Sequence, residues 1–344
     1  MSILWNLQWT PGDPTKDTVD QPRQRIININ KGANSIMSIA YLFPGQGAQA
    51  VGMGKDAYES DENAKNIFDE ADTSLGFSLS DLCFNGPEDT LTQTINTQPA
   101  ILTASIAMLE ASRSILAQKG YSEPAFLAGH SLGEYSALVA AQSLPFGEAV
   151  KLVRERGRLM QAAGDASEGA MAAVMGMDES KLEEICNKNG VDMANLNSTD
   201  QIVISGSKSG VEKAQEMAEE AGARRVVALK VSAAFHSSLM DPAVPGMRDA
   251  LNNSKIETPN IPVVANVTAK PLNDSQDILE ELASQIRSPV QWFRTIQFLD
   301  AQGVDTYIEI GPGRVLTGLV KRILGEAETI NISTMEDLEK LSGS

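Results

Sequence analysis

The stretch PAFLAGHSLGEYSALVAA, residues 124–141, decides the fold around the most chemically informative part of this 344-residue chain. It begins as a short apolar run, passes through the string GHSLG and continues as an apolar segment of helical composition. A serine in a GxSxG string between a strand and a helix lies on a sharp turn that exposes its hydroxyl, and the glycines let other segments come close. The first amides of the helix can stabilise an oxyanion. The stretch therefore predicts a strand, a tight turn and a helix, with Ser131 as a nucleophile.

Short apolar runs alternate with helical periodicity along most of the chain on either side of this stretch. Such alternation is typical of a mostly parallel sheet with helices on both faces. We therefore expect an α/β fold with a hydrolase-like sheet core. The expected strands are residues 39–43, 124–128, 261–267 and 306–310, and the expected helices are residues 98–119, 146–160 and 315–324.

Residues 169–231 carry a pattern of their own, in which strand and helix signals follow the order βαββαβ. This order is the split pattern of a ferredoxin-like unit. We expect a small ferredoxin-like subdomain here, inserted into a large α/β catalytic domain of residues 38–168 and 232–335. Residues 1–37 are polar, contain three prolines and lack periodicity, which predicts a flexible leader, and residues 336–344 are expected to be a tail.

The composition narrows the classes of function. A formal net charge of −17 makes the chain repel nucleic acid and anionic lipid, and aromatic residues are only 5%. The two cysteines form no ligand cluster and suit a reducing compartment. We find no apolar run of membrane-spanning length and no secretory signal. The prediction is a cytoplasmic protein that binds no metal, membrane or nucleic acid, or a protein of an organelle stroma or matrix if the leader is a targeting peptide.

A serine nucleophile needs a base, and the chain contains only two histidines. His130 is adjacent to Ser131, which places it poorly for reaching across a tight turn, so His236 is the candidate base. A lone histidine beside a phenylalanine is more often a satisfied core residue, but no other imidazole is free to serve Ser131. The group that orients the ring stays open between Asp241 and a backbone carbonyl.

Two further segments carry candidate binding groups. The sequence PGQGAQ, residues 44–49, follows the first predicted strand, and glycine-rich turns of this kind point backbone amides at anions, so we expect it to form a wall of the site. The helix predicted over residues 146–160 carries Arg154, Arg156 and Arg158. Arg154 and Arg156 flank its apolar stripe, where a guanidinium can hold a buried carboxylate. The pattern does not separate these two arginines.

Several motifs of the chain occur together in one order. Taken together, they resemble malonyl-CoA:acyl carrier protein transacylases, to which the acyltransferase domains of fatty acid and polyketide synthases are related. The resemblance covers about residues 38–335. The motifs are LFPGQGAQ at 42–49, GHSLGEYSAL at 129–138, RERGRLMQ at 154–161, AFHSSLM at 234–240 and GPGRVLTGL at 311–319.

The resemblance implies a role for each matching residue. Ser131 matches the family nucleophile, His236 its general base, and Arg156 the arginine that pairs with the free malonyl carboxylate. Gln46 and the backbone amide of Leu132 match the oxyanion hole.

Three more matches concern the surroundings of the site. Gln285 matches a glutamine whose backbone carbonyl helps to orient the histidine. Asn197 matches an active-site asparagine, although Asn195 stands two positions away. Phe235, the residue before the histidine, resembles malonyl-selective members of the family.

The family implies a ping-pong transfer of malonyl from malonyl-CoA to the phosphopantetheine thiol of an acyl carrier protein, through a malonyl-serine ester, in fatty acid synthesis. Malonyl-CoA is then a substrate, phosphopantetheine comes with the partner, and no cofactor is permanently bound. We expect a monomer. The alternatives are a discrete acyltransferase of a polyketide pathway, an α/β-hydrolase-type thioesterase, which shares the GxSxG turn, and a non-catalytic docking protein, which has no need of Ser131.

Overall fold

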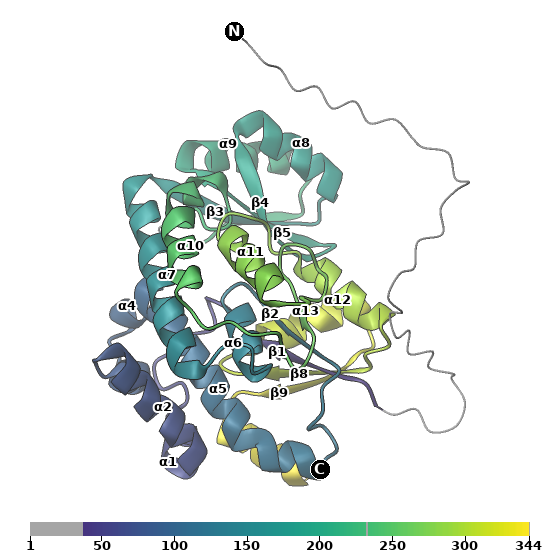
Figure 1. Ribbon diagram of the computed structural model, residues 1–344. Coiled ribbons are helices and arrows are strands. Elements are labelled where there is room, and N and C mark those ends of the chain that lie inside the picture. The colour runs from purple at the N-terminus through teal and green to yellow at the C-terminus, as the bar shows by residue number, and fades with distance from the viewer. Residues whose placement is uncertain (1–36, 232, 344) are drawn as a thin grey trace, which may run out of the picture. The chain divides into compact units, whose positions relative to one another are not determined.

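The computed structural model describes residues 37–231 and 233–343 of the chain. The predicted leader, except for Met37, lies outside these residues. The described elements form two sheets, one parallel and one antiparallel, each with helices of its own (Figure 1).

A five-stranded sheet in the order β7-β2-β1-β8-β9 forms the centre of the larger part, and all of its pairs are parallel. Every residue of β1 and β8 is buried. Burial on both faces explains why these strands are nearly continuous apolar runs in the sequence. The strands are β1 (Ile39–Phe43), β2 (Phe126–Gly129), β7 (Val263–Val264), β8 (Thr306–Ile310) and β9 (Glu328–Ile332).

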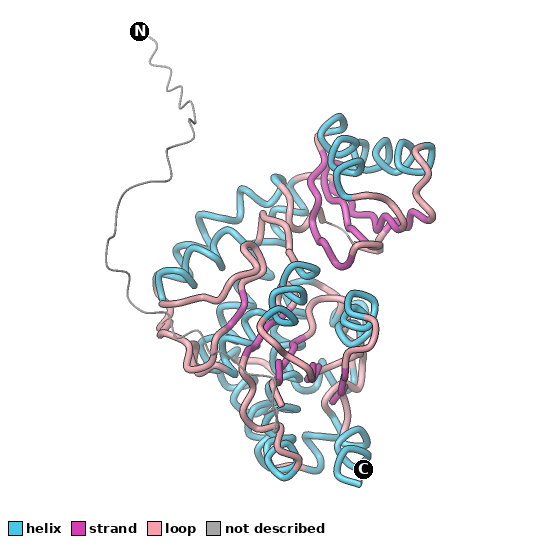
Figure 2. Tube along the Cα trace, turned by 90° about the vertical axis from the view of Figure 1, so that its right-hand side faces the viewer, coloured by secondary structure: helices cyan, strands magenta, loops and turns pink. Residues whose placement is uncertain are grey.

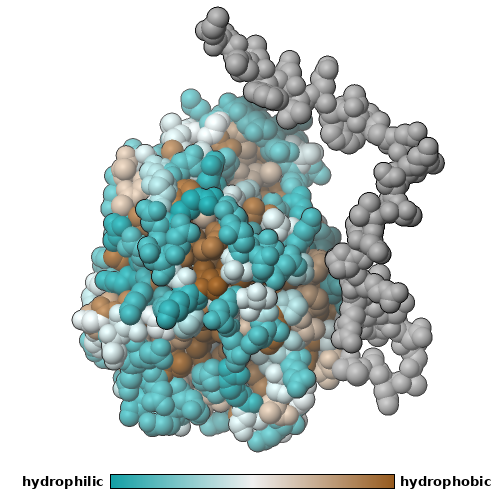
Figure 3. Space-filling view, in the orientation of Figure 1, coloured by the Kyte–Doolittle hydropathy of each residue, from teal (hydrophilic) through white to brown (hydrophobic). Residues whose placement is uncertain are grey.

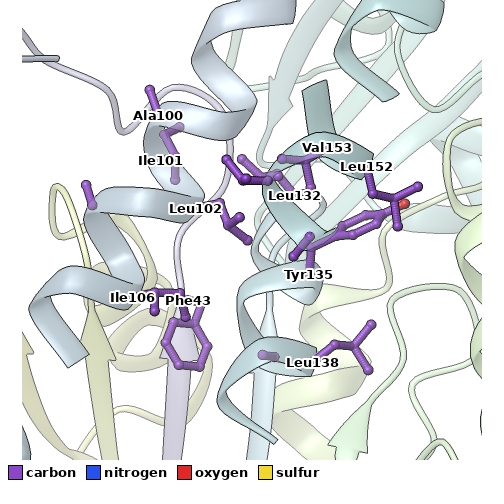
Figure 4. Close-up of a cluster of buried hydrophobic side chains, with 14 of the residues drawn as sticks. Phe43, Ala100, Ile101, Leu102, Ile106, Leu132, Tyr135, Leu138, Leu152 and Val153 are labelled. Atoms are coloured by element: carbon purple, nitrogen blue, oxygen red, sulfur yellow. The ribbon is translucent and has the colours of Figure 1, made fainter. Parts of the chain in front are cut away.

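The side chains of β1 alternate between two buried clusters. Ile39, Tyr41 and Phe43 belong to a cluster with residues of α5 (Thr94–Gln118), α6 (Gly133–Ala140) and α7 (Phe146–Ala166), part of which Figure 4 shows. Ala40 and Leu42 belong to a second cluster with residues of α12 (Trp292–Ala301) and α13 (Val315–Leu324). Because successive side chains of a strand point to opposite faces, helices cover both faces of the sheet, as predicted.

The helices of the larger part are α1 (Lys55–Ser60), α2 (Glu62–Leu75), α3 (Leu79–Asn85), α4 (Glu88–Leu91), α5 (Thr94–Gln118), α6 (Gly133–Ala140), α7 (Phe146–Ala166), α10 (Val244–Asn252), α11 (Ser275–Gln285), α12 (Trp292–Ala301), α13 (Val315–Leu324) and α14 (Met335–Gly343), with one 3-10 helix, η1 (Ser238–Ala243).

The antiparallel sheet is a unit of four strands in the order β4-β5-β3-β6. Its chain order, β3-α8-β4-β5-α9-β6, is the predicted βαββαβ order. Residues of α8 and α9 share one buried cluster with the sheet, and Figure 2 shows this unit at one end of the larger part. The elements are β3 (Gly169–Met175), α8 (Glu179–Asn189), β4 (Val191–Ser198), β5 (Gln201–Ser207), α9 (Lys208–Glu220) and β6 (Arg225–Ala228).

Main-chain hydrogen bonds join this unit to the larger part beyond the covalent connections. Asn195 of β4 forms a parallel bridge with Val290, just ahead of α12. The Val290 N–H donates to the Ala194 carbonyl at 2.8 Å, and the Leu196 N–H donates to the Val290 carbonyl at 2.9 Å. These bonds tie the antiparallel sheet to the segment that carries α12.

Helix α5 corrects two predictions. It begins at Thr94 rather than residue 98 and contains Pro99, because the sequence pattern took the proline as a start signal whereas the helix already turns ahead of it. The helix is also long and apolar enough to cross a membrane by length and composition alone, contrary to the expectation that no run reaches that length. Most of it is buried in the protein, so it is the central helix of the core.

The remaining differences lie where the apolar pattern of the sequence is weak. The elements that the sequence pattern does not predict include helices α1 to α4, α10, α11 and α12 and strand β9, and β7 covers only Val263–Val264 of the strand expected over residues 261–267. Residues 336–344 were expected to be a tail, but α14 spans Met335–Gly343 and buries Leu338. The face drawn in Figure 3 is mostly hydrophilic, with apolar residues in its recesses, in keeping with the net charge of −17.

Close contact between β1, β2 and α6 depends on two glycines. A Cβ on Gly133 would lie 2.1 Å from the Phe43 carbonyl oxygen, and one on Gly129 would lie 1.9 Å from the Gly133 carbonyl oxygen. Both contacts are with backbone, which cannot rotate away as a flexible side chain could. The sheet and α6 can therefore approach this closely only with glycine at these positions.

We predict that Gly133→Ala lowers the free energy of unfolding by about 3 kcal/mol or more, as expected for overpacking against backbone. Gly318→Ala is the matched control, because Gly318 lies inside α13 with nothing within 4 Å of an added Cβ. The control should raise stability by up to about 1 kcal/mol through helix propensity. Urea unfolding of both variants measures the difference, and equal stability of the two would contradict the prediction.

Candidate active site

Ser131 lies in the turn between β2 and α6, where the parallel strand ends. Its φ of 51° is in the left-handed region, which costs about 1–2 kcal/mol for a residue with a side chain. Three hydrogen bonds hold the turn: His130 N–H to the Phe43 carbonyl at 3.0 Å, Gly133 N–H to the His130 carbonyl at 2.9 Å, and Ser131 N–H to Asn266 Oδ1 at 2.6 Å. The strand, turn and helix are those predicted from the sequence.

The structure brings the candidate base to the candidate nucleophile. His236 Nε2 lies 2.8 Å from Ser131 Oγ. The other ring nitrogen, Nδ1, lies 2.8 Å from the carbonyl oxygen of Gln285 and 3.2 Å from that of Ser288. Because a carbonyl can only accept, the proton of the neutral ring is on Nδ1 and Nε2 accepts from the serine hydroxyl. Asp241, the alternative orienter, instead pairs with Arg287 at 2.8 Å.

The environment of His236 keeps its ring neutral. Burial first, and then the nearby charge of Arg156, lower the pKa of this histidine to about 3. The ring is therefore unprotonated at neutral pH and can take a proton from Ser131. His236 also has a left-handed φ, 57°, so both partners of this hydrogen bond are held in a sparsely populated conformation.

Arg156 is almost completely buried, with 1% of its surface exposed. Its guanidinium donates to Gln98 Oε1 at 2.7 Å, to Gln285 Oε1 at 2.8 Å and to Ser131 Oγ at 3.2 Å. Among the ion pairs of the described residues, none involves this arginine. A buried cation that is solvated only by neutral groups is unfavourable, so this position favours an anionic ligand.

The two neighbouring arginines have different surroundings. Arg154 donates to Asn96 at 3.1 Å and lies over the ring of Phe77 at 4.3 Å. Arg158 is exposed and pairs with Glu155 at 2.6 Å. Only Arg156 among the three reaches Ser131, which separates the residues that the sequence pattern left together.

A cavity of about 780 Å³ opens next to these groups. Its wall includes Gln46 of the glycine-rich turn, Ser131, Arg156 and His236 from the larger part, and Asn195 from the antiparallel sheet. Its volume is within the range of about 300–1,000 Å³ that holds small-molecule ligands. The cavity lies beyond the carboxyl ends of β1 and β2, where ligands bind in open α/β sheets.

The predicted oxyanion donors are the side chain of Gln46 and the backbone N–H of Leu132. Gln46 lines the cavity, and its side-chain amide is 3.4 Å from Thr94 Oγ1. Leu132 caps the N-terminus of α6, and within the described residues its N–H donates to no other group. Neither contact tests the oxyanion role, which stays a prediction.

The supporting residues predicted from the sequence have different positions. Gln285 places its carbonyl on His236, as the resemblance implies, and its side chain also contacts Arg156. Asn197 lies outside the cavity wall and bonds through Oδ1 to His130 Nε2 at 2.9 Å, whereas Asn195 lines the cavity.

Sequence reasoning missed a buried polar layer behind the serine. Gln98, Glu134, Asn266 and Glu281 are all nearly or fully buried there. Burial, and then the charge of Glu281, raise the pKa of Glu134 well above its usual range, and burial raises the pKa of Glu281 to about 7. Only Glu134 lies within a motif, directly after GHSLG, so the sequence offered a signal for it alone. Among the described residues, no cluster of three His, Cys, Asp or Glu side chains could hold a metal ion.

Comparison with known proteins places this geometry in a family. The family described as acyl transferase domain matches residues 40–338. The chain belongs to the acyl transferase domain family. It is 49% identical over 306 residues to a malonyl CoA-acyl carrier protein transacylase of Bacillus subtilis, covering 88% of this chain and 95% of that one. A Staphylococcus aureus protein of the same description is 42% identical over 305 residues, covering 87% and 97%.

Solved structures of acyl transferases agree with the fold. The malonyl CoA-acyl carrier protein transacylase of Coxiella burnetii has a TM-score of 0.85 at 38% identity, covering 89% of this chain and 97% of that one. A malonyl-transacylase solved in complex with a type II polyketide synthase acyl-carrier protein has a TM-score of 0.84 at 39% identity, covering 89% and 99%. The predicted fold class, a mostly parallel α/β core with an antiparallel subdomain, is confirmed.

We predict that His236 does not titrate between pH 5 and 8 in the folded enzyme, because burial and then the charge of Arg156 lower its pKa to about 3; burial also lowers the pKa of His130. The unfolded chain binds these protons near pH 6.5, so the native state loses stability as the pH falls below that value. With only two histidines, NMR titration of the ring signals can follow each one. Arg156→Met should raise the pKa of His236, and a wild-type midpoint near 6.5 for His236 would count against the assignment.

Proposed function

We propose that this acyl transferase moves malonyl from malonyl-CoA to the phosphopantetheine thiol of an acyl carrier protein through an ester on Ser131. The observation that carries the proposal is one oxygen with two partners: Ser131 Oγ is 2.8 Å from the base His236 and 3.2 Å from the buried cation Arg156. The names of the relatives at 49% and 42% identity support the choice of malonyl and carrier protein.

In the first half-reaction His236 Nε2 takes the proton of Ser131 as its oxygen attacks the thioester carbonyl. The C–S bond then breaks, and coenzyme A leaves with the proton from His236. In the second half-reaction the carrier thiol gives its proton to His236, attacks the malonyl-serine ester and releases the serine hydroxyl. The same imidazole therefore acts as base and acid in each half, which its low pKa permits by keeping it neutral at rest.

When the serine oxygen attacks, negative charge develops on the carbonyl oxygen of the acyl group, and hydrogen-bond donors beside Ser131 must stabilise it. We assign this role to the side-chain amide of Gln46 and the backbone N–H of Leu132 at the start of α6. One such donor is worth roughly 3 kcal/mol in comparable sites. Gln285 supports the base through its carbonyl, and Asn197 acts one step further away, through His130.

Arg156 supplies the selectivity for malonyl in this proposal. The malonyl carboxylate would pair with the buried guanidinium, whose present partners are neutral. An uncharged acyl group leaves that cation without a counter-ion and is therefore rejected. Phe235, which also lines the cavity, gives the remainder of the acyl group an apolar neighbour.

One exposed cation of the cavity wall can contact the phosphates of the substrate. This residue is Lys230, and the wall also contains the buried Arg156 and two exposed aspartates, Asp89 and Asp165. Both coenzyme A and phosphopantetheine carry phosphate, and on a chain of net charge −17 a local cation favours their entry.

We further propose that the enzyme works as a cytoplasmic monomer without a permanently bound cofactor. Residues 169–231 form the small subdomain in this proposal.

A polyketide pathway is the second candidate, because one similar structure is a transacylase bound to a type II polyketide synthase acyl-carrier protein. The chemistry at Ser131 is the same in fatty acid and polyketide synthesis, so the two pathways differ in the carrier protein that accepts the malonyl group. Transfer rates to purified fatty-acid and polyketide carrier proteins distinguish the two pathways. Free malonate released without carrier dependence would instead support a thioesterase.

We predict that incubation with malonyl-CoA adds the mass of one malonyl group to the wild-type enzyme and none to Ser131→Ala. Intact-protein mass spectrometry measures the adduct, and addition of carrier protein should remove it from the wild type. A wild-type enzyme that stays unmodified at short reaction times, or a Ser131→Ala variant that is modified equally, contradicts the proposed function.

We also predict that Arg156→Ala lowers kcat/KM for malonyl-CoA by roughly 30-fold or more, because loss of one partner of a buried charge pair costs about 2–5 kcal/mol. The rate with acetyl-CoA should fall much less, since acetyl has no carboxylate. Arg158→Ala is the matched control on the same helix, exposed and paired with Glu155, and should leave both rates unchanged. An unchanged malonyl-to-acetyl ratio in Arg156→Ala would remove this residue from substrate recognition.

A further inference from the structure

Behind Ser131, the carboxyl group of Glu134 is a fully buried acceptor that the proposed mechanism does not use. Its Oε2 accepts a hydrogen bond from the side-chain amide of Gln285, and its Oε1 accepts from the Asn266 N–H at 3.3 Å. Gln285 contacts Arg156, and Asn266 contacts the Ser131 N–H. Glu134 is therefore one contact away from both the serine turn and the buried cation.

The side-chain amide of Gln285 can take only one orientation in these surroundings. At its Nε2 end lie two acceptors, Glu134 Oε2 and the Ser131 carbonyl oxygen, the latter at 2.9 Å. At its Oε1 end lies the NH2 group of Arg156 at 2.8 Å. Rotating the amide by half a turn would set its N–H groups against the guanidinium and its oxygen against two acceptors. The acceptors on one side thus keep an oxygen facing Arg156 on the other.

We propose that Glu134 is a positioning residue for malonyl recognition, which holds the Gln285 amide so that its oxygen aims the Arg156 guanidinium at the acyl group on Ser131. The inference rests on the proposed function, since it concerns the group that would bind the malonyl carboxylate. Gln98 Oε1 supports the guanidinium from a second direction, at 2.7 Å. Glu281, the other buried carboxyl nearby, accepts instead from the Val267 N–H at 2.7 Å, and among the described residues its carboxyl group has no hydrogen bond to the side chain of Gln285 or Arg156.

Glu134→Gln tests the proposal with little change of volume. A glutamine at this position has one acceptor oxygen and one donor nitrogen, so it cannot accept from both Gln285 and Asn266. Either the Gln285 amide turns its N–H groups toward Arg156 or the Asn266 N–H loses its partner. We expect the ratio of kcat/KM for malonyl-CoA over acetyl-CoA to fall about tenfold, as for the loss of one hydrogen bond to a charged group. A purely structural role would lower both rates together and leave the ratio unchanged.

Glu309→Gln is the matched control. Glu309 is also fully buried and accepts from the backbone N–H groups of Leu316 and Thr317, at 3.0 and 2.7 Å, but it caps α13 rather than touching the site. This variant should lose stability, seen as a lower urea midpoint, with a malonyl-to-acetyl ratio within about twofold of the wild type.

Gln285→Met keeps the proposal testable if Glu134→Gln does not fold, because it removes the amide through which Glu134 acts. It should lower the same ratio at least as much. In an Arg156→Ala background, Glu134→Gln should cause no further change of the ratio. An unchanged ratio in Glu134→Gln or in Gln285→Met overturns the inference while the proposed function stands. If the wild-type enzyme forms no malonyl adduct, the proposed function itself has failed.

Discussion

A guanidinium buried with neutral partners is the constraint around which the site of this protein is built. Arg156 has 1% of its surface exposed, and the oxygens that surround it come from Gln98 on α5, Gln285 on α11 and Ser131 at the start of α6. Without these dipoles, burial of the charge would be prohibitive. With them, the cation is held in place but not neutralised. Burial, and then the positive charge of this arginine, lower the pKa of the neighbouring imidazole and keep it uncharged. One buried charge therefore favours an acidic substrate and also helps to keep the base neutral.

The fold provides this arrangement by converging elements at the end of the parallel sheet. Ser131 follows β2, His236 precedes η1, and Arg156 lies in the middle of α7, which packs against α5. Left-handed backbone at Ser131 and His236 points their side chains at each other, and the glycines around the turn let β1, β2 and α6 pack closely enough to hold it. Conformational strain at two residues is offset by packing in the surrounding core.

The sequence predicted the parts of this structure that depend on local pattern. Strands buried on both faces, such as β1 and β8, are apolar runs, and GHSLG lies between a strand and a helix, so these features were found. Periodicity could not distinguish Arg156 from Arg154, because the difference lies in which one meets Gln98 and Gln285 across the core. The sequence pattern also gives no sign that Glu134 is buried. An acidic residue in the first turn of a helix is ordinarily exposed to solvent and stabilised by the helix dipole. The sequence pattern predicts a later start for helix α5 than the structure has, because a proline such as Pro99 is typical of a first helical turn.

The bridge between β4 and the segment at Val290 restrains one side of the cavity. Two main-chain hydrogen bonds at Val290 fasten the antiparallel sheet, which supplies Asn195 to the cavity wall, to the segment ahead of α12, in addition to the covalent connections. Swinging the sheet away from that segment would break both bonds. Movement of the Asn195 side of the cavity relative to the segment ahead of α12 is therefore opposed by main-chain hydrogen bonds as well as by the covalent connections.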